Sequence, residues 1–153
     1  MENKPLKRHS VLQPLSREHH YGLQLCWKIR TGFKKEIETL RIRNYVIWFY
    51  ENHLLPHFMI EEKYIFPILG NDNDLIKRAL SEHRKIKRLV LSETELYKSL
   101  NSLEEVLETH IRFEERILFN EIQSVATNEQ LQKIQFYHSD IKFADNLTDV
   151  FWE

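Results

Sequence analysis

The chain has 153 residues, of which 42% are hydrophobic, 29% charged and 12% aromatic. This length predicts one domain, residues 1–153, with enough residues for a hydrophobic core. The 22 basic and 23 acidic residues nearly balance, so the net charge of −1 argues against nucleic acid or an anionic membrane as a partner. The single cysteine, Cys26, excludes an intramolecular disulfide framework and a zinc site built from cysteines. Eight histidines point instead to imidazole and carboxylate chemistry.

The hydropathy pattern predicts a soluble, cytoplasmic protein. Residues 1–15 are mixed and basic, and they lack the apolar run of a secretory signal. The most apolar stretch, residues 45–50, is far shorter than the roughly 20 residues of a membrane-spanning helix. The free thiol of Cys26 suits a reducing compartment.

Apolar residues recur with helical spacing, and three glycines and four prolines are too few for a many-turned β-protein. A first helix is expected to begin at Ser16, a residue type that caps helix N-termini, and to continue to about Phe33. A second is expected over about residues 38–66. Pro56 lies inside it and predicts a kink, because proline lacks the N–H and clashes with the preceding turn.

Two further helices follow the clearest turn in the sequence, residues 70–73 (GNDN). Their apolar spacing extends to about Leu118 without placing the break between them. Ser92-x-x-Glu95 and Ser102-x-x-Glu105 both have the form of a capping box, in which the two side chains satisfy backbone N–H groups at a helix start. Either motif is therefore a candidate start for the fourth helix.

The C-terminal part of the chain predicts a short fifth helix and a tail. Thr127-x-x-Gln130 is a third capping-box pattern and opens a helix to about Ser139. The apolar residues 150–152 pack either on this chain or on a second copy, so monomer and homo-oligomer both stay open. The fold class is all-α: an antiparallel, up-down-up-down four-helix bundle over about residues 12–122, with a short helix and tail over 127–153.

Each of the four long helices carries one histidine on its apolar face: His19, His57, His83 and His110. Two of these histidines are followed one turn later by a glutamate, Glu61 or Glu114. Residues four apart on a helix point within about 40° of each other, so each pair faces the same way. About ten helical residues separate His57 from the turn at 70–73, and about eleven separate that turn from His83, which puts both histidines at one level.

This set of side chains predicts a metal site in the bundle core. A carboxylate is costly to bury without a partner, yet Glu61 and Glu114 lie among isoleucines and leucines. Histidine and carboxylate together suit iron, manganese or zinc. The alternative is a salt bridge from each glutamate to an arginine such as Arg30 or Arg43, with hydrogen-bonded core histidines. That alternative explains less well why four histidines and two glutamates all lie at one level of the bundle.

Four other histidines and the single cysteine lie outside this set. His9, His20 and His138 lie off the apolar faces and are expected at the surface. His53 precedes His57 by one turn, so it either supports a ligand from behind or is itself an extra ligand. Cys26 lies on the apolar face of the first helix and is expected in the core rather than as a catalytic thiol.

Four segments resemble the motifs of bacterial hemerythrin-like, or HHE cation-binding, domains. They are PLSREHHYGL at 14–23, HFMIEEKYIFP at 57–67, SEH at 81–83 and HIRFEERILF at 110–119. The resemblance covers about residues 12–122, and its specificity comes from the complete set in this order.

The resemblance implies a four-helix bundle around a non-haem di-iron centre. Carried over to this sequence, His19 and His57 would bind one iron, and His83 and His110 the other. Two carboxylates would bridge the irons beside an oxo or hydroxo group. Zinc or manganese could substitute for iron with the same ligands.

The resemblance implies Glu61 as one bridging carboxylate and leaves two candidates for the other. The oxygen-carrying hemerythrins place this carboxylate five residues after the histidine, which here is Glu115. Several HHE domains place it four residues after, which is Glu114. The apolar stripe of the helix favours Glu114, since Glu115 points about 100° away from the stripe centre.

The sequence departs from the oxygen-carrying hemerythrins at Lys87, where those proteins have a fifth histidine. One iron would then lack a ligand unless His53, another glutamate or water replaces it, which argues against reversible oxygen transport and favours an open, reactive or sensory site. Ferritin-like di-iron proteins need Glu-x-x-His on two helices, and that motif does not occur in this chain.

Three functions follow as hypotheses. The first is a di-iron protein that binds or senses dioxygen, nitric oxide, a peroxide or cellular iron, and this reading favours a binding protein over an enzyme. The second is a di-iron oxidase, peroxidase or repair enzyme for metal centres, which a substrate-sized pocket would favour. The third is a metal-free helical interaction module.

Overall fold

The computed structural model describes residues 7–138 and 142–153, and this part of the chain forms helices and no strands. The first rod is α1 and the second is a run of helical segments from 39 to 68. The third rod is α4, and the fourth is the run from 96 to 125. The bounds are α1 (Gln13–Lys34), α2 (Thr39–Phe49), η1 (Tyr50–Leu54), α3 (Leu55–Ile60), η2 (Glu61–Ile65), η3 (Phe66–Ile68), α4 (Asp74–Leu91), α5 (Leu96–Phe113), η4 (Glu114–Leu118), α6 (Phe119–Val125) and α7 (Asn128–Tyr137).

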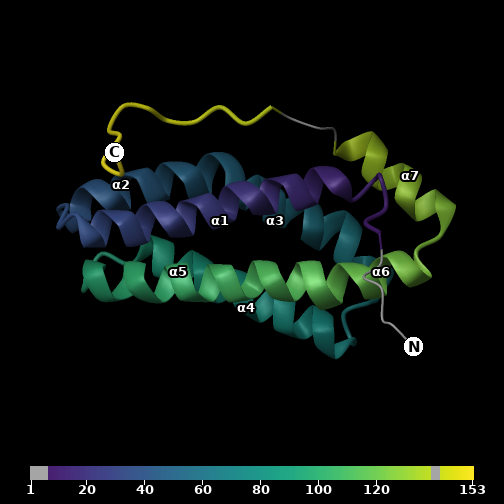
Figure 1. The fold of residues 1–153 in the computed structure, drawn as a ribbon. Helices are drawn as coiled ribbons and strands as arrows, with labels where there is room; N and C mark the ends of the chain where they lie inside the picture. Colours follow the sequence, from purple (N-terminus) through teal and green to yellow (C-terminus); the bar gives the residue numbers. More distant parts are fainter. Residues whose placement is uncertain (1–6, 139–141) are drawn as a thin grey trace, which may run out of the picture.

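Consecutive rods run in opposite directions, so the predicted all-α, up-down-up-down bundle is confirmed (Figure 1). After α7, the tail returns along the outside of α1 and α2 toward the end where those two helices meet (Figure 1). Among the described residues, no helix combines the length and the apolar character that a membrane crossing requires.

The first helix begins earlier than predicted, at Gln13 instead of after a cap at Ser16. Pro14 occupies its first turn, where a missing N–H costs nothing and the fixed φ of proline suits the helix. Leu12 and Leu15 are fully buried, so burial of this turn also favours the longer helix. Ser16 therefore lies inside the helix, and its backbone N–H bonds to the Leu12 carbonyl.

The second rod stays helical across Pro56, and the distortion falls in the turn before it. Residues 50–54 form a π-helical turn in which the Leu55 N–H bonds to the Tyr50 carbonyl, and Pro56 follows in the first turn of α3. The wider turn accommodates a proline ring that would clash with the carbonyl four residues earlier in a regular helix. The irregularity expected at Pro56 is thus a π turn.

The break between the third and fourth rods lies at residues 92–95, and neither expected capping box forms there. Ser92 ends α4, and its hydroxyl donates to the Thr94 carbonyl. Glu95 adopts a left-handed conformation (φ 48°) just before α5 and makes no side-chain cap. Ser102 lies within α5. Both sequence matches were wrong because a short polar motif forms a cap only where the chain actually starts a helix.

The predicted start of the short helix α7 is confirmed, because its N-terminal capping box forms. Thr127 Oγ1 accepts from the Gln130 N–H at 3.1 Å, and Gln130 Oε1 accepts from the Thr127 N–H at 2.9 Å, which completes a capping box. The helix ends at Tyr137, and the expected end at Ser139 lies outside the described residues.

The buried apolar residues form two clusters, one toward each end of the bundle. One contains Leu25, Phe49 and Leu103, and the other contains Leu15, Ile76 and Phe119. His19 and His83 lie between the two clusters along the first and third rods, and the buried histidines and shared glutamates of the other two rods lie where the clusters meet. The fold therefore encloses a polar layer within an apolar core.

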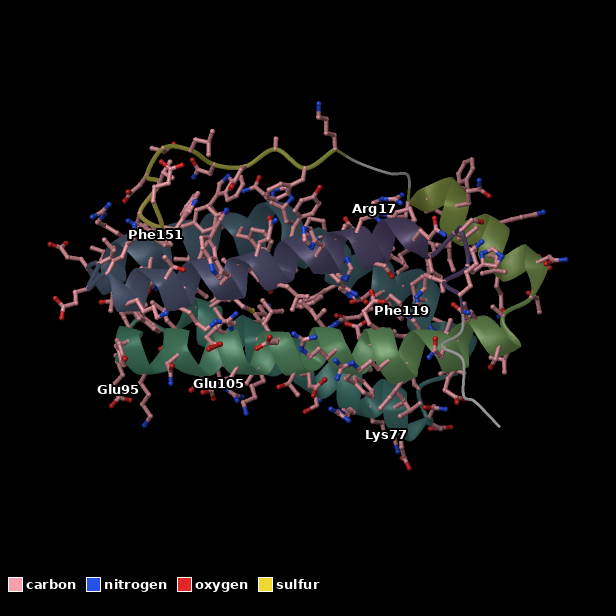
Figure 2. The ribbon with its side chains drawn as sticks, viewed as in Figure 1. Arg17, Lys77, Glu95, Glu105, Phe119 and Phe151 are labelled. Carbon is pink, nitrogen blue, oxygen red and sulfur yellow. The ribbon has the colours of Figure 1, made fainter. Side chains whose placement is uncertain are left out.

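The C-terminal tail packs on this chain. Phe151 is buried in the first cluster, near the end of the bundle where α1 and α2 meet (Figure 2). Asp145 Oδ2 accepts from Lys28 Nζ at 2.6 Å, and Asp149 forms two hydrogen bonds with Arg41 at 2.7 and 2.8 Å. The choice left open for residues 150–152 is thus resolved for Phe151, which packs on its own bundle.

The chain reversal after α1 offers a stability test. Glu36 has φ 57°, and the Ile37 N–H bonds to the Gly32 carbonyl, so glutamate occupies the position that usually holds glycine in this helix ending. We expect Glu36→Gly to raise the free energy of unfolding by about 1 kcal/mol, because glycine has no Cβ strain there. Urea unfolding measures the change. Glu38→Gly, at a position with φ −52°, should give no such gain.

Candidate metal centre

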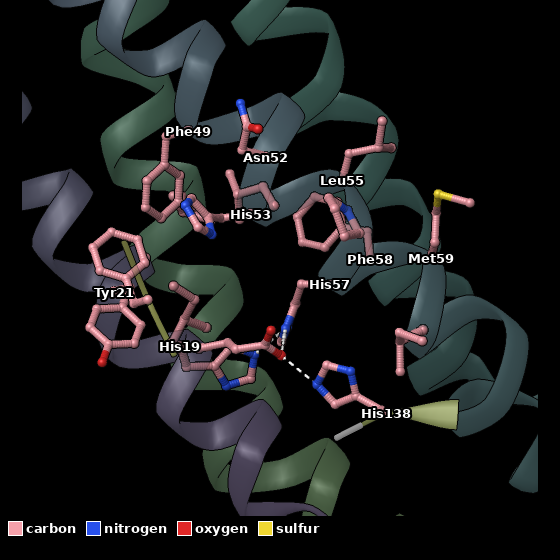
Figure 3. Close-up of a pocket in the computed structure, with 18 of the residues that line it drawn as sticks. His19, Tyr21, Phe49, Asn52, His53, Leu55, His57, Phe58, Met59 and His138 are labelled. Atoms are coloured by element: carbon pink, nitrogen blue, oxygen red, sulfur yellow. Dashed lines mark hydrogen bonds and ion pairs between the residues drawn. The ribbon is translucent and has the colours of Figure 1, made fainter. Parts of the chain in front are cut away.

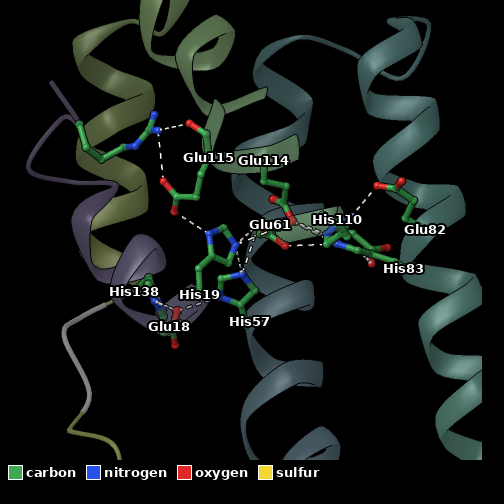
Figure 4. Close-up of polar contacts among 12 residues, drawn as sticks. Glu18, His19, His57, Glu61, Glu82, His83, His110, Glu114, Glu115 and His138 are labelled. Carbon is green, nitrogen blue, oxygen red and sulfur yellow. Dashed lines mark hydrogen bonds and ion pairs between the residues drawn. The ribbon is translucent and has the colours of Figure 1, made fainter. Parts of the chain in front are cut away.

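Six buried side chains from all four rods meet at one level of the bundle (Figure 4). The four histidines come from α1, α3, α4 and α5, one each, and the two glutamates begin η2 and η4. They are His19, His57, His83, His110, Glu61 and Glu114. Both glutamates are 0% exposed, so water cannot solvate their carboxylates.

These six residues form two overlapping groups that could each hold a metal ion. In each group, one atom per side chain lies within 4.8 Å of the corresponding atoms of the others. The first group is His19, His57, Glu61 and Glu114, and the second group is Glu61, His83, His110 and Glu114. Each group thus has two histidines of its own, and both groups share the same two glutamates.

The inward-facing atoms of the two groups lack the partners that a folded core normally supplies. Both carboxylate oxygens of Glu61 and of Glu114, and Nε2 of His83 and His110, have no hydrogen-bond partner among the described residues beyond the ion-pair contacts that they make with one another. Nε2 of His57 lies 3.1 Å from Nε2 of His19. Unpaired buried polar atoms are costly and rare, and a bound cation would satisfy all of these lone pairs together. The donor set therefore fits a metal.

Arginine pairing does not explain the buried glutamates. Arg30 pairs with Glu104 and Glu108 at 3.2 and 3.4 Å, and Arg43 donates to the Ser92 carbonyl. Among the described residues, no lysine or arginine forms an ion pair with Glu61 or Glu114 within 4.0 Å. The salt-bridge alternative from the sequence is thus wrong for both proposed arginines.

Each of the four histidines also contacts a second carboxylate on its outer side, which the sequence analysis missed (Figure 4). We call Glu18, Glu62, Glu82 and Glu115 the outer carboxylates. The Nδ1–oxygen distances are 2.6 Å for His19–Glu115, 3.0 Å for His57–Glu18, 2.9 Å for His83–Glu62 and 2.8 Å for His110–Glu82. Such a partner holds the Nδ1 proton and leaves Nε2 free to bind a metal.

The outer carboxylates connect the rods in a closed ring. The first rod supplies Glu18 to His57 of the second rod, and the second rod supplies Glu62 to His83 of the third. The third rod supplies Glu82 to His110 of the fourth rod, and the fourth rod supplies Glu115 to His19 of the first. A signal was present in the sequence, since every outer carboxylate directly adjoins one of the six inner residues. The helix that each one contacts, however, depends on bundle geometry.

Two π-helical turns begin at the shared glutamates. Glu61 opens η2 and Glu114 opens η4, and each is followed by an outer carboxylate, Glu62 or Glu115. Both shared glutamates have ordinary helical backbone angles, with φ −59° at Glu61 and −62° at Glu114. The residue after each of them contacts a histidine of another rod: Glu62 contacts His83, and Glu115 contacts His19.

The surrounding carboxylates govern the pKa values of the histidines. Burial by itself lowers the pKa of His57, but the negative charges of Glu61 and Glu18 outweigh it and raise the pKa to about 10. Burial likewise opposes ionisation of His83, and hydrogen bonds to Glu114 and Glu61 raise its pKa to about 11. Without metal, both histidines are therefore protonated at neutral pH.

The residues that the sequence left open as alternative ligands occupy different places in the structure. Glu114 belongs to both groups, whereas Glu115 lies behind His19 and pairs with Arg8 at 3.2 Å. His53 belongs to neither group and packs among aromatic rings, with ring centroids 5.1 Å from Trp48. Lys87 is exposed on α4 and has no part in either group.

The prediction that His138 lies at the surface is wrong. It is 7% exposed, and its Nε2 lies 2.9 Å from Glu18 Oε1, the same oxygen that contacts His57 Nδ1 at 3.0 Å. The error arose because the periodicity within α7 does not show that His138, the residue after this helix, contacts Glu18 of α1. His9 and His20 are exposed, as predicted.

Aromatic rings cover the two groups unequally. Phe58 stacks on His83 with centroids 3.8 Å apart, and Phe66 lies 5.4 Å from the same ring. Phe119 stacks on His19 at 5.3 Å. These rings limit the access of water to the imidazoles.

A cavity of about 440 Å³ adjoins the polar layer (Figure 3). It lies between α1, the second rod and α5, and tail residues 142–143 line its outer side. His19 and His57 of the first group line it, and so does His110 of the second group. The centre is thus open to a defined internal space on one side.

Comparison with known families agrees with this geometry. The family model described as hemerythrin HHE cation-binding domain matches residues 10–94, more than half of the chain. The chain belongs to this family. The match includes His19, His57, Glu61 and His83, whereas His110 and Glu114 lie beyond it.

Comparisons with curated proteins and with solved structures found no match. For His110 and Glu114 of this hemerythrin HHE domain protein, the case therefore rests on the geometry of the two groups. These two residues lie in the same buried polar layer as the four inner residues that the family match includes.

Proposed function

We propose that this protein holds two non-haem irons in its bundle core and uses them to bind or sense dioxygen, nitric oxide, a peroxide or cellular iron. The observation that carries the proposal is the pair of buried two-histidine groups that share Glu61 and Glu114. Shared carboxylates suit a pair of adjacent cations, because each glutamate has two oxygens and both of its oxygens lack another partner. Membership of a cation-binding family supports the same proposal.

The residues of this chain have distinct parts in the proposal. His19 and His57 would hold one iron, His83 and His110 the other, and the two shared glutamates would bridge them. Bound iron would supply reversible one-electron chemistry and a coordination position for a small ligand. The outer carboxylates keep the imidazoles oriented, and the aromatic cover restricts water.

Metal content of protein purified without oxygen is the direct test, together with its absorption spectrum before and after exposure to air. We expect about two irons per chain and new near-ultraviolet or visible charge-transfer bands after oxidation. One metal per chain, or zinc in place of iron, would reject the redox chemistry but keep the ligand set. No bound metal, even after reconstitution with ferrous iron, would overturn the proposal and favour the metal-free interaction module.

A di-iron oxidase is the second candidate function, and the cavity beside His57 is the observation that favours it. An enzyme that oxidises an organic substrate needs space for that substrate next to the metals, and a cavity of about 440 Å³ provides it. Turnover of an added substrate with consumption of dioxygen would distinguish this function from ligand binding alone.

A further inference from the structure

Glu18 differs from the other outer carboxylates in the side chain that lies behind it. Arginines pair with two of the others, Glu82 and Glu115, at 3.3 and 3.2 Å. Glu18 instead contacts a histidine, and Nε2 of His138 lies 2.9 Å from its Oε1 (Figure 4). The same oxygen lies 3.0 Å from Nδ1 of His57. One carboxylate oxygen therefore joins a histidine of the first group to a histidine outside both groups.

The chemistry of these three groups fixes the direction of both hydrogen bonds. An ionised carboxylate only accepts hydrogen bonds, so both imidazoles donate to Glu18. His57 donates from Nδ1, which leaves its Nε2 as the nitrogen that would bind a metal. His138 donates from Nε2. The orientation of the His57 ring thus depends on the position of an oxygen that His138 also holds.

Without His138, the carboxylate of Glu18 would be free to turn toward water. The Glu18 side chain is 31% exposed, and a glutamate side chain has several rotatable bonds whose freedom favours a mobile arrangement. A second hydrogen bond from a buried partner limits that freedom, and His138 is only 7% exposed. Loss of this bond would leave His57 with a less constant partner.

His138 is itself held by the end of α7. Its backbone N–H donates to the carbonyl of Ile134 at 2.8 Å, and Ile134 is fully buried. The preceding residue, Tyr137, stacks on Tyr64 of η2 with ring centroids 4.7 Å apart. A buried ring on an anchored backbone is suited to restrain the more flexible side chain that it contacts.

These contacts connect the end of α7 to a histidine of the first group. We propose that His138 is a positioning residue of the metal centre, which holds Glu18 in the place where Glu18 orients His57. Because His57 belongs only to the first group, the effect should fall on one of the two metal positions. The inference rests on the proposed function where it concerns metal affinity, whereas the restraint on the His57 ring does not need a metal.

Titration of the full chain with ferrous iron against a competing chelator, without oxygen, tests the inference. We expect His138→Phe to weaken one of the two iron affinities by about three- to tenfold, less than the loss of about 10- to 100-fold expected for Glu18→Gln. The combined variant should bind iron no more weakly than Glu18→Gln alone, because His138 acts through Glu18. Unchanged affinities in His138→Phe, or losses that simply add in the combined variant, would overturn the inference.

Two further variants separate positioning from packing. His138→Gln keeps an N–H donor and should restore most of the affinity lost in His138→Phe, so an equal loss in both would contradict the role of the donor. Ile134→Val removes a buried methyl group from α7 and should lower the urea midpoint without changing either iron affinity. A loss of iron affinity in Ile134→Val as large as in His138→Phe would assign the effect to packing. His138→Leu replaces His138→Phe if the larger ring prevents folding.

Magnetic resonance of metal-free protein with ¹⁵N-labelled histidine tests the restraint without iron. The Nδ1–H of His57, assigned by its absence in His57→Gln, should exchange with water about tenfold faster in His138→Phe than in the unaltered protein, and about as slowly as before in His138→Gln. Faster exchange in a protein that binds no iron would retain the positioning role and reject the di-iron function. Two bound irons with unchanged exchange in His138→Phe would retain the function and reject the positioning role.

Discussion

Replacing Glu61 with glutamine is expected to remove the metal centre, although the amide has nearly the size and shape of the carboxylate. Glu61 belongs to both groups, and its two oxygens face His57 Nε2 and His83 Nε2 at 3.3 and 3.2 Å. An amide carries no charge and offers only one oxygen, so it cannot serve two cations at once. We expect iron content to fall from about two per chain to below one, measured by elemental analysis after desalting.

The adjacent residue provides a matched control for this substitution. Glu62 contacts His83 at Nδ1 from outside the site, at 2.9 Å, and belongs to neither group. Glu62→Gln should keep two irons at saturation and weaken metal affinity by about 10- to 100-fold, the usual cost of losing such a partner. Two irons bound with unchanged affinity in Glu61→Gln would contradict the shared role of Glu61.

Metal-free protein should also become less stable when Glu61 is replaced. Burial raises the pKa of Glu61, but the charge of His57 and hydrogen bonds to its neighbours together hold this pKa well below its usual range, so the carboxylate is ionised among protonated histidines. Removing one member of such a buried set leaves charge uncompensated, at a cost of about 3 kcal/mol near neutral pH. Urea unfolding of the metal-free variant measures this loss.

Metal binding is expected to depend steeply on pH and to release protons. In the metal-free protein, carboxylates outweigh burial and raise the pKa to about 10 for His57, about 11 for His83 and about 9 for His110. A metal binds neutral imidazole, so uptake at pH 7 must displace a proton from each of these three histidines. Apparent affinity should therefore rise by up to about three decades per pH unit between pH 6 and 8.

Calorimetry in buffers of different ionisation enthalpy counts the released protons. Phosphate and Tris at pH 7 should give binding enthalpies that differ by about three times the difference between the buffer ionisation enthalpies. Uptake without proton release would show that these histidines are neutral before the metal arrives.

The same pKa shifts set the pH range in which metal-free protein is most stable. A histidine whose pKa is raised by folding contributes stability that is complete below its unfolded value of 6.5 and is lost as the pH rises through about 9 to 11. Glu18 has a pKa lowered to about 2, because hydrogen bonds to His138 and His57 outweigh burial, so its contribution is lost as the pH falls below 4.5. Thermal unfolding of metal-free protein should therefore show a maximum between about pH 4.5 and 6.5, and loaded protein should keep its stability at higher pH.

The inner residues could be found from the sequence because their signal lies within single helices. His57 and Glu61 are one turn apart, and the distances of His57 and His83 from a recognisable turn fix their levels. An up-down-up-down bundle then brings residues of equal level together whatever the detailed packing. The fold class and the six inner side chains follow from this alone, as does the start of α7 at Thr127.

Features that depend on how one helix is rotated against another could not be predicted in this way. Glu62 and Glu115 contact histidines of other rods, and the rod that each one reaches depends on how the helices pack. His138 is buried beside Glu18 of α1, a contact between segments far apart in the chain that the periodicity within α7 does not specify.

The sequence by itself therefore determined the bundle and the histidine–glutamate layer of this protein. The tertiary structure alone placed Glu114 rather than Glu115 in the two groups, left His53 outside them and revealed the cavity beside it. The physical reason is that helical periodicity specifies which face of each helix is buried. Partners between helices, and the spaces that they leave, are set by side chains far apart in the chain that meet only when the four rods pack.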